Sequence, residues 1–137
     1  MRTIRMCTTV SLLSLVTAGA AMAQGRLDAA SWVLEKGQGV TIVAGRPASL
    51  KVEDKQMSGS TGCNTFRATM REDAGSKIAI RDVALTRKMC APELADNERA
   101  IVQAFDKTTF IEEKSGVLTF LSGSREPLLV WKAPSRT

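Results

Sequence analysis

The sequence predicts an α+β domain in which an antiparallel β-sheet of about eight short strands curls toward a barrel and carries one packed α-helix. Three observations lead to this fold class. Short segments with alternating apolar and polar residues recur along the chain, as in half-buried strands. Turn residues, mainly glycine and serine, separate most of these segments. Only residues 92–107 place apolar side chains at helical spacing, and no internal repeat or linker divides the chain.

Residues 1–23 have the pattern of a secretory signal peptide. Arg2 and Arg5 give it a positive start, a mostly apolar run follows, and an Ala-x-Ala motif ends at Ala23. The run is shorter than the roughly 20 residues that a transmembrane helix needs, and no second run of that length follows. We therefore expect cleavage near Ala23, a single domain over residues 24–137, a periplasmic or secreted location and no transmembrane segment.

The composition argues against several classes of function. The formal net charge of +5 falls to +3 when the two arginines of the signal peptide are removed, which is too small for a dedicated nucleic-acid binder. The chain contains no histidine and no tyrosine. Because histidine is the commonest general base and zinc ligand, we expect no enzyme activity, no metal site and no cofactor.

Short strands are expected on both sides of the single helix. Before it, the expected strands are residues 31–35, 40–43, 48–52, 66–71, 77–81 and 83–85. Residues 55–60 are interpreted as a connection that leads into a glycine turn. After the helix, the expected strands are residues 109–112, 117–121 and 128–132, joined by hairpin-like turns.

The helix is expected from Pro92 to about Lys107. Proline suits the first turn of a helix, Glu93 suits its positive N-terminal end, and Lys107 suits the other end. The apolar residues recur at spacings that fall on one helical face. That face is predicted to lie against the sheet through Leu94, Ile101, Val102 and Phe105.

Two tryptophans lie near opposite ends of the predicted domain, each within a strand. Trp32 and Trp131 could both pack in the core and bring the terminal strands together. Alternatively, they could line an apolar cavity inside the curled sheet that accepts a lipid or another hydrophobic molecule.

A glycine turn is predicted at residues 59–66. Gly59 and Gly62 are followed by Cys63, Asn64 and Phe66, a pattern typical of a tight turn that continues into a strand. A phosphate-binding loop would need lysine and serine or threonine after the last glycine and then a helix. Here cysteine and asparagine follow, so the glycines are interpreted as structural.

Two cysteines remain after removal of the signal peptide, which contains Cys7. In an oxidising compartment an even pair indicates a disulfide, so we expect a bond between Cys63 and Cys90. The alternative is that Cys63 is a nucleophile whose thiolate is stabilised by Arg67 or Lys88. No histidine is available to act as its base.

A group of cations precedes the helix. Arg81, Arg87 and Lys88 lie close in sequence and, together with Lys77, could form a basic patch. The alternative is an ordinary solvated surface. We take Arg81, Arg87 and Lys88 as a candidate binding rim.

These features together resemble the META/HslJ family of small exported bacterial domains. The resemblance rests on the Trp32 strand, the G-x-x-G-C-N-x-F turn at residues 59–66, the T-R-x-M-C segment at residues 86–90, and the following helix and hairpins. It implies an antiparallel, barrel-like sheet with a packed helix and an association with heat shock, drug tolerance or virulence. It implies no settled biochemical activity. Ala68 departs from the glycine that the family often has there.

The leading hypothesis is therefore a non-catalytic exported domain that binds an envelope component or a protein partner in stress or drug tolerance. A carrier of a small hydrophobic ligand inside the curled sheet is the second hypothesis, and an enzyme using Cys63 or a carboxylate is the third. We expect a monomer, and the sequence leaves the partner unknown.

Overall fold

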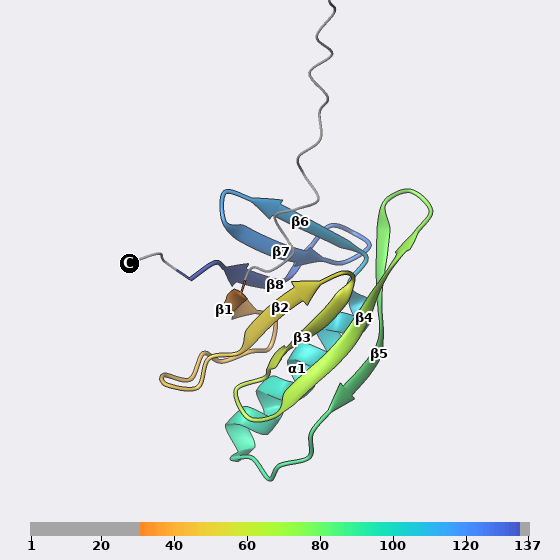
Figure 1. Cartoon of the computed structure of the whole chain (residues 1–137). Helices are drawn as coiled ribbons and strands as arrows, with labels where there is room; N and C mark the ends of the chain where they lie inside the picture. Colours follow the sequence, from red (N-terminus) through yellow and green to blue (C-terminus); the bar gives the residue numbers. More distant parts are fainter. Residues whose placement is uncertain (1–30, 135–137) are drawn as a thin grey trace, which may run out of the picture.

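The computed structural model describes residues 31–134, so the predicted signal peptide and its cleavage site lie outside the described residues. These residues form eight strands and one helix, in agreement with the predicted α+β class (Figure 1). The elements are β1 (Ser31–Gly37), β2 (Ser49–Glu53), β3 (Gln56–Ser60), β4 (Thr65–Asp73), β5 (Lys77–Leu85), α1 (Pro92–Lys107), β6 (Phe110–Lys114), β7 (Val117–Leu121) and β8 (Pro127–Lys132).

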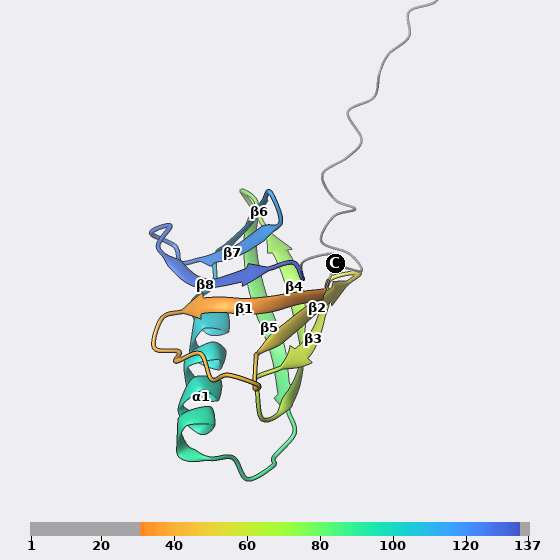
Figure 2. The same cartoon turned by 90° about the vertical axis from the view of Figure 1, so that its left-hand side faces the viewer.

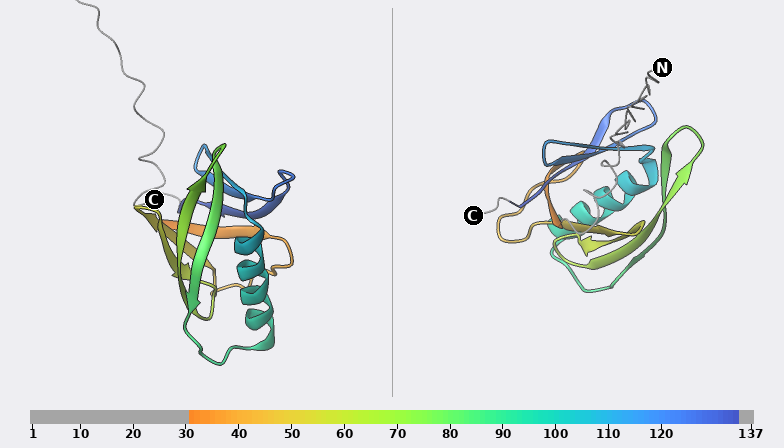
Figure 3. Two further views of the ribbon diagram at one scale, coloured as in Figure 1. Left: turned by 90° about the vertical axis from the view of Figure 1, so that its right-hand side faces the viewer. Right: turned by 45° about the horizontal axis from the view of Figure 1, so that its top comes forward.

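The strands make one antiparallel sheet in the order β5-β4-β3-β2-β1-β8-β7-β6. It consists of two meanders, β1 to β5 and β6 to β8, which join where β1 pairs with β8 (Figure 2). The sheet curls around α1 but does not close, and β5 and β6 are its two edges (Figure 3). The Ile78 N–H donates to the Thr109 carbonyl at 2.8 Å, so the two edges touch at one point.

Two of the expected segments differ from the structure. Residues 40–43 were predicted as a strand from their alternation, but they form a loop. The loop is held by the side chain of Asn97 on α1, which accepts from the Thr41 N–H at 2.8 Å and donates to the Thr41 carbonyl at 2.6 Å. Residues 56–60, interpreted as a connection, are strand β3, which pairs with both β2 and β4.

Strand β5 is continuous where two strands were expected. Its pairing with β4 shifts register between Arg67 and Thr69, opposite residues 82 and 83. Asp82 has a φ of +54°, which places an irregularity in the middle of the strand. The bulge therefore lies on β5 opposite Ala68, the position at which the sequence departs from the family pattern.

Helix α1 has the predicted bounds, and Ile101 and Phe105 lie on its buried face as predicted. Leu94 and Val102 are only half-buried. Asn97 and Ala104 complete the buried face instead. The face is therefore centred on Ile101, with neighbours four residues before it and three and four residues after it.

The space between sheet and helix is filled by aromatic side chains. Phe66, Phe105, Phe120 and Trp131 form a chain of contacts with ring centroids 5.2, 6.1 and 6.0 Å apart. Trp32 is buried beside them, as the core interpretation of the two tryptophans predicts. The space between the loop at residues 40–43 and α1 amounts to only about 10 Å³. This is about the space that a single water molecule requires, so this packing does not favour the carrier hypothesis.

Candidate functional site

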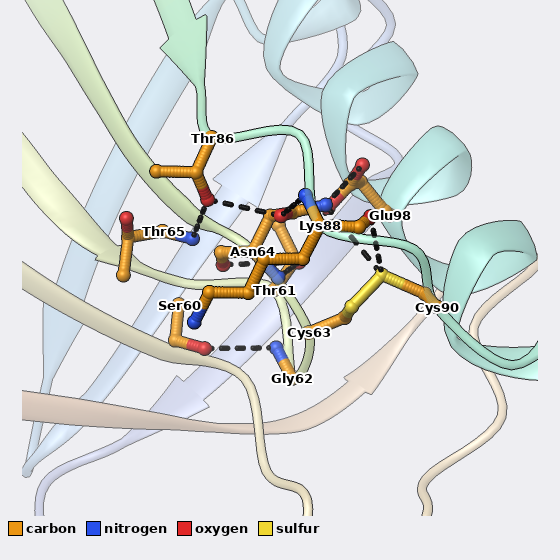
Figure 4. Close-up of a disulfide and its surroundings, with 10 residues drawn as sticks. All are labelled: Ser60, Thr61, Gly62, Cys63, Asn64, Thr65, Thr86, Lys88, Cys90 and Glu98. Atoms are coloured by element: carbon orange, nitrogen blue, oxygen red, sulfur yellow. Dashed lines mark hydrogen bonds between the residues drawn. A yellow bond between two sulfur atoms is a disulfide. The ribbon is translucent and has the colours of Figure 1, made fainter.

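The glycine turn lies between β3 and β4, at the end of the sheet near the start of α1 (Figure 4). Gly62 has a φ of +96°, and a Cβ there would lie 2.7 Å from the Arg46 carbonyl oxygen. At Gly59 a Cβ would collide with the Ser49 carbonyl of the neighbouring strand. Both positions therefore require glycine for steric reasons, which agrees with their structural interpretation.

Asn64 connects this turn to the segment after β5 and to α1. Its side chain is 2% exposed, and all of its hydrogen-bonding capacity is used. The Oδ1 atom accepts from the Thr86 hydroxyl at 2.9 Å and from the Lys88 N–H at 2.8 Å. The Nδ2 group donates to Glu98 Oε1 at 3.2 Å and to Cys90 Sγ at 3.5 Å. One side chain thus fixes three segments relative to one another.

Glu98 and Thr61 complete this polar cluster. The buried Thr61 hydroxyl donates to Glu98 Oε2 at 2.8 Å and accepts from the Asn64 N–H at 3.1 Å. Both carboxylate oxygens of Glu98 therefore accept a hydrogen bond from the turn. Thr61 and Thr86 belong to the two motifs noted in the sequence, but no pattern in the sequence indicates Glu98, because only the fold shows that it faces the turn.

The predicted disulfide between Cys63 and Cys90 is present, with Cα atoms 6.0 Å apart. It joins the glycine turn to the segment that leads into α1 (Figure 4). In this bond Cys63 has no free thiol that could act as a nucleophile. The disulfide and Asn64 together fasten residues 86–90 to the end of the sheet.

Residues 86–88 prolong β5 beyond its assigned end. The Thr86 N–H donates to the Thr65 carbonyl at 3.0 Å, and the Thr65 N–H donates to the Thr86 hydroxyl at 3.1 Å. Two residues later, the Lys88 N–H donates to Asn64 Oδ1. The side chain of Asn64 therefore takes the place of the next backbone acceptor in the β4–β5 ladder.

A surface groove runs between this prolonged strand and α1. One part has a volume of about 700 Å³ and is lined by Asn64, residues 83–89 and Glu98. A second part of about 400 Å³ is lined by residues 80–83 and by Val102, Gln103 and Asp106 of the helix. Val83 belongs to both parts, and we call them together the β5–α1 groove.

The candidate rim residues are distributed along this groove. Arg87 and Lys88 line the larger part, and Arg81 lines the smaller one. All three are exposed, and none takes part in an ion pair between described residues. Met89, beside them, is 100% exposed. The structure thus brings Arg87 and Lys88 next to Asn64 and Glu98 and leaves Arg81 farther along the same groove.

Comparison with known proteins identifies the family. The model of the META domain matches residues 25–135. The chain belongs to the META domain family. The region that matches the META domain contains the glycine turn, Cys63, Cys90 and α1. No curated protein matches this META chain.

Two solved structures share the fold of this META domain. A protein solved by NMR is 23% identical, with a TM-score of 0.63 and coverage of 82% of this chain and 95% of that one. A protein from Burkholderia xenovorans, also solved by NMR, is 22% identical, with a TM-score of 0.58 and coverage of 81% and 86%. At these identities the likeness concerns the fold alone.

Two further properties apply to residues 31–134 of the META domain. Helix α1 lacks the length and apolar content needed to cross a lipid bilayer. No group of three or more histidine, cysteine, aspartate or glutamate side chains within these residues is arranged to hold a metal ion.

Proposed function

We propose that this META domain is a non-catalytic binding module that acts outside the cytoplasm, periplasmic or secreted, and supports stress or drug tolerance in an HslJ-like role. It binds an envelope component or a protein partner through the β5–α1 groove. The observation that carries the proposal is the groove itself, on a wall that Asn64 and the disulfide hold in place. Arg87 and Lys88 on this wall are exposed and form no ion pair with any residue between 31 and 134.

The reactive groups near the groove support binding over catalysis. Cys63 and Cys90 are bonded to each other, and both oxygens of Glu98 accept hydrogen bonds from the turn. The chain has no histidine to supply a base near neutral pH. Exposed cations on a fixed wall can bind a partner without any group of shifted pKa, because exposed charges attract and orient a partner of opposite charge.

The disulfide and the N-terminal segment support the proposed location. Disulfides persist in oxidising compartments such as the periplasm and the exterior, and they are rare in the cytosol. Residues 1–23 have the features of a cleaved secretory signal. Fractionation of cells that produce the whole chain tests the location, and recovery of uncleaved protein from the cytosol contradicts it.

The binding role is tested by capture from a solubilised envelope extract on immobilised protein of residues 24–137. Three forms are compared: the unchanged protein, Arg87→Glu with Lys88→Glu, and the control Lys36→Glu with Lys114→Glu, whose lysines are exposed and outside the groove. Each captured component is identified by mass spectrometry, purified and titrated. We expect the rim variant to bind about tenfold or more weakly and the control to bind normally. Equal binding by all three forms, or no specific capture, contradicts the proposal.

A further inference from the structure

The edge of β5 is open along the β5–α1 groove. The sheet does not close, and the backbone bond from Ile78 to Thr109 touches the opposite edge only near the start of β5. Beyond that point β5 pairs with β4 alone. An edge strand presents a row of backbone donors and acceptors to a further strand.

The direction of the backbone groups is fixed by the bonds on the inner side. Ala84 pairs with Arg67, and the N–H groups of Thr86 and Lys88 donate to acceptors on the β4 side. Successive residues of an extended chain point their N–H groups to opposite sides. The N–H groups of Leu85 and Arg87 therefore point away from β4, toward the open edge.

The groove beside this edge has a wall that suits an extended peptide. Val83 and Leu85 are half-buried and pack against the core, so they offer apolar surface to every second side chain of an added strand. Thr86, Arg87 and Lys88 are exposed at the end of the same wall. The volume of about 700 Å³ lies along residues 83–89, the part that follows the bulge.

We propose that an extended acidic segment of a partner protein adds to the sheet as a strand along residues 83–89 of β5 and its prolongation. Its backbone pairs with the Leu85 and Arg87 amides, its apolar side chains contact Val83 and Leu85, and its carboxylates meet Arg87 and Lys88. This mode of recognition rests on the proposed function and specifies the partner's chemistry. Backbone pairing supplies affinity in such complexes, and the side-chain contacts supply specificity.

The charge of the groove distinguishes among the strands that could pair with the open edge of β5. A second copy of this chain, paired antiparallel through the same edge, would bring the cations of both copies to one interface, where like charges repel. The segments outside the described residues are basic: residues 1–30 contain three arginines and one aspartate, and residues 135–137 contain one arginine. The carboxylate of Glu98, across the groove, already accepts hydrogen bonds from Thr61 and Asn64. An acidic segment of a partner protein therefore fits the exposed cations better than a second copy or the basic end segments of this chain.

The test uses isotope-labelled protein of residues 24–137 and a short synthetic peptide in which glutamate alternates with valine. Amide hydrogen exchange of Leu85 and Arg87 is measured by NMR with and without the peptide. One control peptide has the same sequence with an N-methyl group on every backbone amide, which keeps the charge and removes the donors needed for strand pairing along both edges. A second control replaces glutamate by lysine. The rim variant Arg87→Glu with Lys88→Glu is titrated in parallel.

We expect the glutamate peptide to slow exchange at Leu85 and Arg87 by about tenfold or more. Both control peptides and the rim variant should bind about tenfold or more weakly. Unchanged exchange at these two amides, or equal binding of the N-methylated peptide, overturns strand addition. If that happens while envelope capture still depends on Arg87 and Lys88, the proposed function stands and only this mode of recognition fails.

Discussion

At the scale of single residues, Asn64 acts as a substitute for backbone. Its side chain accepts from the Lys88 N–H, where the β4–β5 ladder would otherwise end, and donates to Glu98 on the helix. A side-chain amide can do this because it has the carbonyl acceptor of a peptide group and two N–H donors. Because Asn64 is buried, its hydrogen bonds must all be kept, since each buried polar group left unpaired costs free energy.

Asn64→Ala should lower the free energy of unfolding by about 2–4 kcal/mol, because it removes the hydrogen-bond partner of the Lys88 N–H and of Glu98 Oε1 beside a buried cluster. Urea denaturation measures the loss. Ser58→Ala, an exposed polar residue on β3, is the control and should change stability by less than about 0.5 kcal/mol. A similar small change for both variants would contradict the role assigned to Asn64.

Gly62→Ala and Gly45→Ala separate two effects of glycine. Both residues have positive φ, +96° and +75°, but a Cβ meets the Arg46 carbonyl at Gly62 and nothing within 4 Å at Gly45. We expect a loss of about 1 kcal/mol at Gly45 from backbone conformation alone and about 2–4 kcal/mol at Gly62, where the collision adds to it. Thermal unfolding of the two variants compares them. Equal losses would show that the turn accommodates the methyl group.

At the scale of elements, the disulfide joins the glycine turn to the segment just before α1, which is far from the turn along the chain. Cys63 and Cys90 are separated by 27 positions, so the bond restricts the unfolded chain considerably. It also keeps residues 86–90 against the sheet, where the groove wall depends on them. Stability and the shape of the groove are therefore linked at this point.

Cys90→Ala should lower the stability of the oxidised protein of residues 24–137 by about 2–5 kcal/mol. The double variant Cys63→Ala with Cys90→Ala should lose no more than the single variant, because the bond is already absent. Thiol titration under denaturing, non-reducing conditions provides the direct check. Two free thiols per chain in protein recovered from the periplasm would contradict the bond.

Phe105→Ala should cost about 3–5 kcal/mol, because Phe105 is buried between Phe66 and Phe120 at the centre of the aromatic chain. Gln103 is exposed on α1 where the helix lines the β5–α1 groove, and Gln103→Ala should change stability by less than about 0.5 kcal/mol. Denaturant titration of both variants tests the orientation of the helix, and comparable losses would refute it.

The sequence predicts well what is local in the chain. The bounds of α1 follow from Pro92 and Lys107, and the glycine turn follows from residue types and their spacing. The disulfide follows from the even pair of cysteines that remains after removal of the signal peptide. Prediction from the sequence fails where a side chain far along the chain determines the local structure. Residues 40–43 alternate like a strand, but they form a loop in which Asn97, far along the chain, bonds both the N–H and the carbonyl of Thr41. Glu98 joins the site for a similar reason, since only the fold places it against the turn.

At the scale of the whole molecule, α1 connects the two edges of the sheet and fills its curl (Figure 3). The aromatic chain runs from β4 through the helix to β7 and β8, so both meanders share one core. Since that core is filled, recognition must use the surface of the domain. The β5–α1 groove lies on that surface, between the helix and the strand edge that the sheet leaves open.

The pairing of β1 with β8 also orders events during folding. Leu34 lies opposite Trp131, so the first and last strands meet only after nearly the whole domain is available (Figure 2). The hairpins from β2 to β5 close over short loops and can form early, whereas the contact between β1 and β8 requires a long loop and is slow to form. Until β8 arrives, one side of β1 has no strand partner. A chain delivered from its N-terminus therefore completes its core with the last strand to emerge, and a truncation before Pro127 would leave β1 as a permanent open edge.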